Sequence, residues 1–187
     1  MSINMKSSLE RFKSFVPMLK VVCKIIKPRV VVEYGPGTST QCFLDYSDAN
    51  IYAWESHSSF YTQAKQRFSS NPRAEITLGD TRSGSGHKGV YVNAPFAKLG
   101  AESADIVFVD GRHRADCMIC SSIIVKSTGV VILHDDERAI YDAGRNMFSH
   151  SFRDKQLITG LYANNDTVIN VIKEAYSEES KELKEYA

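Results

Sequence analysis

The chain has 187 residues, of which 43% are hydrophobic and 24% charged, the balance of a folded globular protein and not of a disordered one. This length supports one hydrophobic core, so we expect a single domain over 1–187, with an N-terminal helix within 1–28 and a charged tail over 177–187. The formal net charge of +1 gives no overall electrostatic reason to bind nucleic acid or an anionic membrane.

Charged residues interrupt the N-terminal segment, so we expect no secretory signal there. These residues are Lys6, Glu10, Arg11, Lys13 and Lys20. No apolar run approaches the roughly 20 residues that a membrane-spanning helix needs. We therefore expect a cytoplasmic protein whose cysteines are reduced.

Two of the cysteines, Cys117 and Cys120, form a CxxC pair, a spacing that elsewhere serves redox chemistry or half of a zinc site. No second CxxC accompanies it, and the pair lies inside an apolar helical pattern with Met118, Ile119 and Ile123. We interpret both as small buried side chains on a helix face.

Taken in chain order, apolar periodicity predicts an alternation of helices and strands. The predicted helices cover 8–26, 38–46, 58–68, 113–126 and 137–148. The predicted strands cover 29–34, 50–55, 74–78, 105–109 and 129–133. A glycine- and serine-rich stretch over 81–89 indicates an irregular loop. Two late runs, 155–162 and 167–173, flank an Asn-Asn-Asp turn signal and predict an antiparallel hairpin.

This alternation is typical of an α/β protein with parallel strands and right-handed crossovers. We expect a doubly wound, mostly parallel sheet with helices on both faces and a C-terminal antiparallel hairpin. Ligands of such a sheet bind at the carboxyl ends of its strands. The residues that end the five predicted strands are Glu33, Glu55, Asp80, Asp110 and the run His134, Asp135 and Asp136.

The loop after the first strand indicates the class of ligand. Gly35 and Gly37 permit a tight turn and a close approach of backbone to a ligand, and Thr38 offers a hydroxyl to cap the next helix. A dinucleotide loop would place a third glycine where Thr40 stands. Glu33 would repel a phosphate but suits an ammonium group, and Glu55, about 20 residues beyond the loop, suits the hydroxyls of a ribose.

An ammonium group and a ribose occur together in S-adenosylmethionine. The residues at these strand ends also resemble the motifs of a known family. The run VVEYGPGTST at 31–40 resembles the first motif of class I methyltransferases, WES at 54–56 the second and GD at 79–80 the third. IVFVDGRHR at 106–114 and GVVILHDD at 129–136 resemble later motifs of a small-molecule subgroup. The resemblance implies a Rossmann-like fold. It also implies a cofactor site built from Glu33, Gly35, Gly37, Thr38, Ser39, Glu55, Ser56, Asp80 and Asp110.

The remaining polar residues at this edge predict the acceptor side of the site. We expect Asp110, His113, His134 and Asp135 to face an oxygen or nitrogen of a small-molecule acceptor, with His134 as general base because imidazole titrates near neutral pH. The loop 81–95, with Arg82, His87, Lys88 and Tyr91, is expected to border the acceptor pocket as a lid.

Three neighbouring carboxylates, those of Asp110, Asp135 and Asp136, require neutralisation. Mg²⁺ would supply it through oxygen ligands, and the alternatives are Arg112, Arg114 and Arg138, or a role for Asp135 or Asp136 as a helix cap. Two other functions remain open: a nucleotide- or NAD-linked oxidoreductase, and a non-catalytic scaffold subunit. A homo-oligomer or partner protein would complete the pocket of so short a chain.

Overall fold

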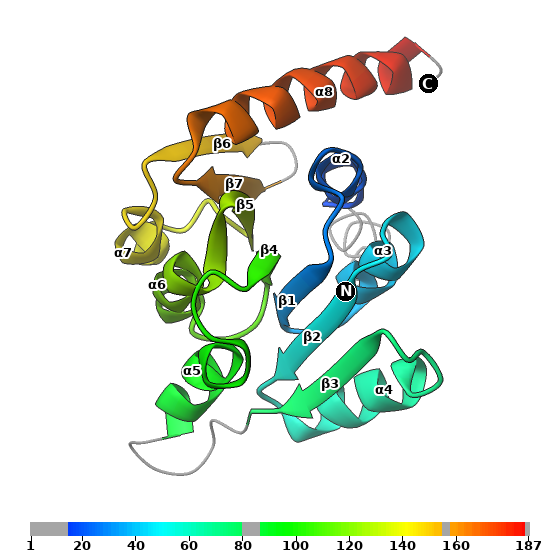
Figure 1. The fold of residues 1–187 in the computed structure, drawn as a ribbon, viewed down its shortest axis with the longest axis vertical. Helices are drawn as coiled ribbons and strands as arrows, with labels where there is room; N and C mark the ends of the chain where they lie inside the picture. The colour runs from blue at the N-terminus through cyan, green and yellow to red at the C-terminus, as the bar shows by residue number, and fades with distance from the viewer. Residues whose placement is uncertain (1–14, 80–86, 155–157, 186–187) are drawn as a thin grey trace, which may run out of the picture.

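The computed structural model describes residues 15–79, 87–154 and 158–185. Their strands form one seven-stranded sheet in the order β3-β2-β1-β4-β5-β7-β6, with helices on both faces (Figure 1). The strands are β1 Val30–Tyr34, β2 Asn50–Glu55, β3 Ala74–Leu78, β4 Ala104–Val109, β5 Val125–His134, β6 His150–Asp154 and β7 Thr159–Ala163. The first five are parallel, and β7 pairs antiparallel with both β5 and β6.

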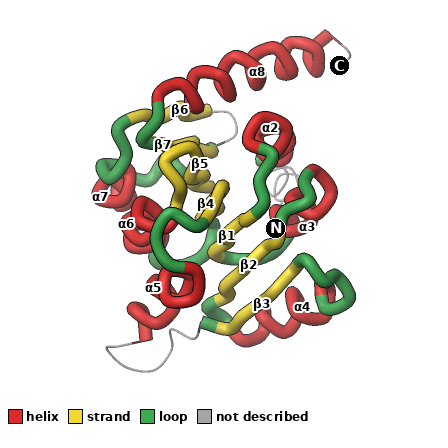
Figure 2. The backbone as a smooth tube through the Cα atoms, in the orientation of Figure 1, coloured by secondary structure: helices red, strands yellow, loops and turns green. Residues whose placement is uncertain are grey.

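The helices cover the sheet in two layers, which the smooth trace of Figure 2 separates clearly. They are α2 Val16–Ile26, α3 Thr38–Tyr46, α4 Ser58–Phe68, α5 His87–Leu99, α6 Arg114–Ile124, the 3-10 turn Ala139–Tyr141, α7 Asp142–Arg145 and α8 Asp166–Glu185. One apolar core lies under α2, α3, α4 and α8, and the other lies under α5 and α6. The predicted doubly wound α/β sheet with its C-terminal hairpin is therefore confirmed.

The order of the strands reverses between β1 and β4, and the backbone there is unusually close. Gly35 follows β1 with a positive φ of 90°, and a Cβ on it would lie 2.8 Å from the backbone nitrogen of Gly111, which follows β4. Only glycine fits such an approach without strain. A doubly wound sheet opens its ligand crevice at this reversal.

The helix α5 corrects the expected loop over 81–95. Residues 80–86 lie outside the described part of the chain, but 87–99 is helical in spite of Gly89 and Pro95. The burial of Tyr91, Val92 and Pro95 explains this, because their spacing places them on one face against the sheet. Packing thus overrides the low helix propensity of glycine and proline. Tyr91 packs its ring on Tyr34, with centroids 5.5 Å apart.

The C-terminal hairpin exists, but only one of its strands is a predicted one: the predicted strand 155–162 overlaps β7. The hairpin is made by β6 and β7, and the predicted strand 167–173 lies in α8. The Asn-Asn-Asp signal starts that helix: Asn165 Oδ1 accepts hydrogen bonds from the backbone N–H groups of Thr167 and Val168. Ile169 and Ile172 are then buried at helical spacing. The prediction of a strand over this apolar run overlooked that spacing.

Two further differences concern helix ends. The helix predicted over 8–26 begins at Val16 among the described residues, and the one predicted over 137–148 breaks into the 3-10 turn and α7. The predicted burial of Cys117 and Cys120 on a helix face is confirmed, since both are buried in α6 and unbridged. Within the described ranges, no helix has the length and apolar character that a membrane crossing requires.

Candidate cofactor and acceptor site

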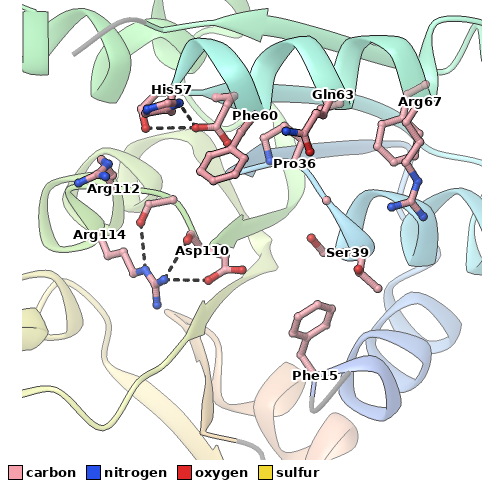
Figure 3. Close-up of a pocket in the computed structure, with 18 residues that line it drawn as sticks. Phe15, Pro36, Ser39, His57, Phe60, Gln63, Arg67, Asp110, Arg112 and Arg114 are labelled. Atoms are coloured by element: carbon pink, nitrogen blue, oxygen red, sulfur yellow. Dashed lines mark hydrogen bonds and ion pairs between the residues drawn. The ribbon is translucent and has the colours of Figure 1, made fainter. Parts of the chain in front are cut away.

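A cavity of about 520 Å³ opens at the carboxyl ends of β1, β2 and β4, and Figure 3 shows the side chains around it. Seven of the residues predicted to bind a cofactor line it: Gly35, Gly37, Thr38, Ser39, Glu55, Ser56 and Asp110. Phe15, Phe60, Gln63 and Arg67 complete much of the wall. The sheet therefore brings residues far apart in sequence to one hollow, as strand ends of a parallel sheet must.

Glu33 lies beneath this hollow and is fully buried. Its two carboxylate oxygens accept hydrogen bonds from the hydroxyls of Ser39 and Thr40, and Ser39 stands in the cavity wall. Burial raises the pKa of Glu33 to about 7, against the opposing effect of these two hydrogen bonds. The direct ammonium contact expected of Glu33 stays a prediction, and in this geometry Glu33 acts on the cavity through Ser39.

The raised pKa of Glu33 predicts how stability depends on pH. The folded protein holds this proton more tightly than the unfolded chain. As the pH rises from about 4.5 to 7, the free energy of unfolding should therefore fall by about 3 kcal/mol. Glu33→Gln should remove that loss. Urea denaturation at pH 5 and pH 8 should show the variant gaining stability relative to the wild type at the higher pH. An equal difference at both pH values would contradict the prediction.

The turn after β1 separates two glycine roles. Gly35 is fixed by its close contact with Gly111, whereas a Cβ on Gly37 would meet no protein atom within 4 Å. Gly37 precedes α3, and its N–H donates to Thr40 Oγ1 at 2.9 Å. Thr38 is the first residue of the helix and not its cap, so the capping role expected of Thr38 falls to Thr40.

Glu55 ends β2 with its carboxylate directed at the cavity wall. Glu55 Oε1 accepts the backbone N–H of His57 at 2.8 Å and the hydroxyl of Ser56 at 3.2 Å. No hydrogen bond to Oε2 occurs within the described ranges. One oxygen therefore holds the carboxylate in place, and the other is available to a ligand hydroxyl.

Beside the cavity, Arg114 joins the ends of β4 and β5. Its guanidinium binds Asp110 Oδ1 at 2.9 Å and Asp135 Oδ2 at 3.0 Å, and it also donates to the backbone oxygens of Gly111, His134 and Asp110. His134 Nδ1 lies 3.0 Å from Asp110 Oδ1. The structure thus brings together Asp110, His134 and Asp135, as predicted from the strand ends.

This group contains two of the three residues expected to hold a metal ion, Asp110 and Asp135, with His134 in place of Asp136. One ligand atom from each of Asp110, His134 and Asp135 lies within 4.8 Å of the others. However, the Arg114 guanidinium already contacts both carboxylates and supplies the neutralising charge. A divalent cation bound by these carboxylates would lie next to the guanidinium of Arg114, which would repel it strongly. The residues present therefore fit an arginine-neutralised cluster better than a Mg²⁺ site.

Asp136 points away from this cluster, which corrects the expected convergence of three acids. Asp136 Oδ1 accepts the hydroxyl of Tyr162 at 2.8 Å, and Asp136 Oδ2 pairs with Arg153 at 2.5 Å. Burial raises the pKa of Asp136 in spite of these partners and of Arg145. The expected helix cap is also wrong, because Arg138 precedes the 3-10 turn and no side chain caps it. Asp136 instead ties the end of β5 to the hairpin.

The predicted catalytic residues do not all face the cavity. Asp110 lines it, whereas His134 is 5% exposed and packs against the ring of Phe15 at 5.1 Å between centroids. His113 lines a second, adjoining cavity. His113 and Asp135 both have positive φ, at 54° and 53°, a strain that concentrates at functional sites.

Some expected site residues lie outside the description, and others were missed. Asp80 and Arg82 fall outside the described residues, as do the side chains of His87 and Lys88. Phe15 lies in the helix predicted over 8–26 and carried no signal of a site, yet it lines the cavity and packs on His134. Phe60, Gln63 and Arg67 carried no signal, because exposed residues on one helix face look alike whether they border a ligand or water.

No protein-family model and no curated protein sequence matches the chain. Solved structures do match. A methyltransferase-like protein from Silicibacter pomeroyi superposes with a TM-score of 0.63 at 15% identity, over 87% of this chain and 93% of its own. A methyltransferase from Geobacter sulfurreducens gives a TM-score of 0.56 at 14% identity, over 86% and 89%. The chain has a Rossmann-like α/β fold, which it shares with these two structures.

The same fold occurs in a protein with a different described activity. Spermidine synthase from Thermotoga maritima matches with a TM-score of 0.58 at 14% identity, over 88% of this chain and 61% of its own. Function on a shared fold depends on the site and not on the sheet. The residues at the strand ends must therefore carry any argument about the reaction of this chain.

Proposed function

We propose that this chain is an S-adenosylmethionine-dependent methyltransferase that acts on an oxygen or nitrogen of a small-molecule acceptor. The observation that carries the proposal is the cavity at the strand reversal. There the open face of Gly37 and the available Oε2 of Glu55 lie in the same wall. The structural likeness to proteins described as methyltransferases supports it.

The cofactor residues divide by the part of S-adenosylmethionine they suit. Glu55 Oε2 would accept a ribose hydroxyl, while Glu55 Oε1 is held by His57. Ser39, with Glu33 beneath it, and the backbone at Gly37 would hold the amino-acid end. When bound, this cofactor supplies a methyl group on a sulfonium sulfur. The protein then has to position the acceptor in line, exclude water and accept one proton.

Asp110 is the residue we propose to accept that proton. Its carboxylate stands in the cavity wall, and its Oδ1 also contacts His134 Nδ1 at 3.0 Å. His134 lies behind it, so His134 holds Asp110 in position and shares the proton. The guanidinium of Arg114 binds the same carboxylate oxygen, Asp110 Oδ1, at 2.9 Å. In this proposal the role of general base, which was expected of His134 alone, is shared by Asp110 and His134.

Cofactor binding provides the direct test. S-adenosylmethionine and S-adenosylhomocysteine should each bind in titration calorimetry and raise the melting temperature, by about 2.7 kcal/mol of added stability at one hundred times the dissociation constant. NAD should do neither, because Glu33 and Thr40 do not suit a pyrophosphate. Binding of NAD alone would favour the oxidoreductase alternative. S-adenosylmethionine binding without turnover on any acceptor would favour a scaffold.

A pair of variants separates cofactor residues from acceptor residues. Glu55→Ala should weaken S-adenosylhomocysteine binding at least about tenfold, because it removes a charge-assisted hydrogen bond. His134→Ala should leave that affinity nearly unchanged and lower turnover about a hundredfold. His134→Asn, which keeps a donor toward Asp110, should recover part of the turnover. Equal losses of cofactor affinity in Glu55→Ala and His134→Ala would contradict this division.

A further inference from the structure

A second cavity, of about 850 Å³, adjoins the first and shares part of its wall. The shared residues are Ser56, His57, Gly111, Arg112 and Arg114. The rest of its lining comes from the start of α6 and from the segment after β5. Because Asp110 directly precedes Gly111, the proposed base lies where the two cavities meet. A molecule in the second cavity would thus lie beside a cofactor in the first.

Positive charge dominates the lining of this second cavity. The lining includes Arg112, Arg114 and Arg138. Among the described residues, Asp116 is the one acidic residue that lines this cavity. Arg114 is committed to Asp110 and Asp135. Arg112 is exposed, and its guanidinium makes no hydrogen bond or ion pair within residues 15–79, 87–154 and 158–185. Arg138 is 55% exposed and reaches Asp135 only at 3.7 Å.

These two arginines come from separate loops, one after β4 and the other after β5. Arginine presents several N–H donors in a plane, which match the oxygens of a carboxylate or phosphate. Apolar surface lies beside them. Ile140 lines the cavity with 74% of its surface exposed, and Tyr141 lies next to it. An exposed isoleucine in a cavity wall is the type of surface that binds an apolar ligand body.

We propose that the second cavity binds the methyl acceptor through an anionic group, a carboxylate or phosphate held by Arg112 and Arg138, with the acceptor's apolar body against Ile140 and Tyr141. The inference rests on the proposed methyltransferase function, because it takes the first cavity to be the cofactor site. It narrows the acceptor from any small molecule to one that has both an anionic and an apolar part.

The test compares three probes of similar shape on protein saturated with S-adenosylhomocysteine. The probes are 4-hydroxybenzoate, 4-hydroxyphenyl phosphate and the uncharged 4-hydroxybenzamide, each titrated by calorimetry. At least one anionic probe should bind about tenfold more tightly than the amide. The double variant Arg112→Gln/Arg138→Gln should reduce that preference to less than about twofold. Arg29→Gln, an exposed arginine before β1, should keep the full preference.

Each result decides the proposal. Preference for the carboxylate or for the phosphate identifies which anion the acceptor carries. Equal binding of all three probes, binding of none, or a preference that survives in the double variant would overturn the anionic acceptor. The proposed function fails separately, in the first step, if S-adenosylhomocysteine does not saturate the wild-type protein. Because Arg112 also lines the first cavity, S-adenosylhomocysteine is titrated separately into the double variant, and the probes are compared at a concentration that saturates it.

Discussion

Gly35→Ala is expected to lower the free energy of unfolding by about 3 kcal/mol or more, whereas Gly37→Ala should leave it nearly unchanged. At position 35 an alanine meets two obstacles: a φ of 90° and a backbone nitrogen of Gly111 2.8 Å from its Cβ. At position 37 the backbone has no positive φ, and the new methyl group meets no protein atom within 4 Å.

For cofactor binding we expect the larger effect from Gly37→Ala, the variant with the smaller effect on stability. Gly37→Ala places its methyl group in the cavity, so it should fold normally and lose S-adenosylhomocysteine affinity by at least about tenfold. Urea denaturation and calorimetry measure the two effects independently. A Gly37→Ala variant with wild-type affinity would show that no ligand approaches this backbone. A Gly35→Ala variant with wild-type stability would mean that the close contact with Gly111 relaxes without cost.

Arg114→Met should lower the free energy of unfolding by about 3 kcal/mol, because removal of one partner leaves the other charges uncompensated. Arg114 is the shared partner of Asp110 and Asp135 and also binds three backbone oxygens. Methionine fills similar space without any donor. Arg145→Met, which also removes a mostly buried arginine but from Asp136 and Asp142, is the matched control.

The same variant tests how the acidic cluster is neutralised. In the wild type, turnover should be unchanged by exhaustive chelation, and Mn²⁺ should not raise the melting temperature. In Arg114→Met, the carboxylates of Asp110 and Asp135 lose their cation, so Mn²⁺ should stabilise this variant and not Arg145→Met. If the wild-type protein required Mg²⁺ or Mn²⁺ for turnover, the assignment of Arg114 as the neutralising cation would be wrong.

The sequence predicted the sheet and the edge of it at which the first cavity opens, because both depend on local signals. Short β-branched runs predict buried strands, and the polar residues that follow them must meet along one edge. This reasoning placed Gly37, Glu55 and Asp110 in one cavity wall. It also identified Arg114 as one possible neutraliser, but the choice among arginine, metal and helix cap depended on side-chain directions that spacing alone does not determine.

The wrong predictions share a physical cause, which is that tertiary burial outweighed local preference. Gly89 and Pro95 indicate a loop, yet the buried face of Tyr91 and Val92 makes 87–99 a helix. In the same way, residues 167–173 were predicted to form a strand, but Ile169 and Ile172 lie on a common buried face of the helix α8. Asp136 faced the hairpin because Arg153 and Tyr162 lay there, and these partners are distant in the sequence.

The two cavities draw on different stretches of the gene, and this has a practical consequence. The proposed cofactor wall comes largely from one stretch of the chain, 35–68, while the second cavity draws its own residues from 113–116 and 138–141. Mutagenesis confined to the two short stretches, with Arg114 kept because it lines both cavities, would thus vary the proposed acceptor surface and leave the proposed cofactor surface intact. Under the proposed function, such a separation would make the chain a compact starting point for laboratory evolution toward new acceptors.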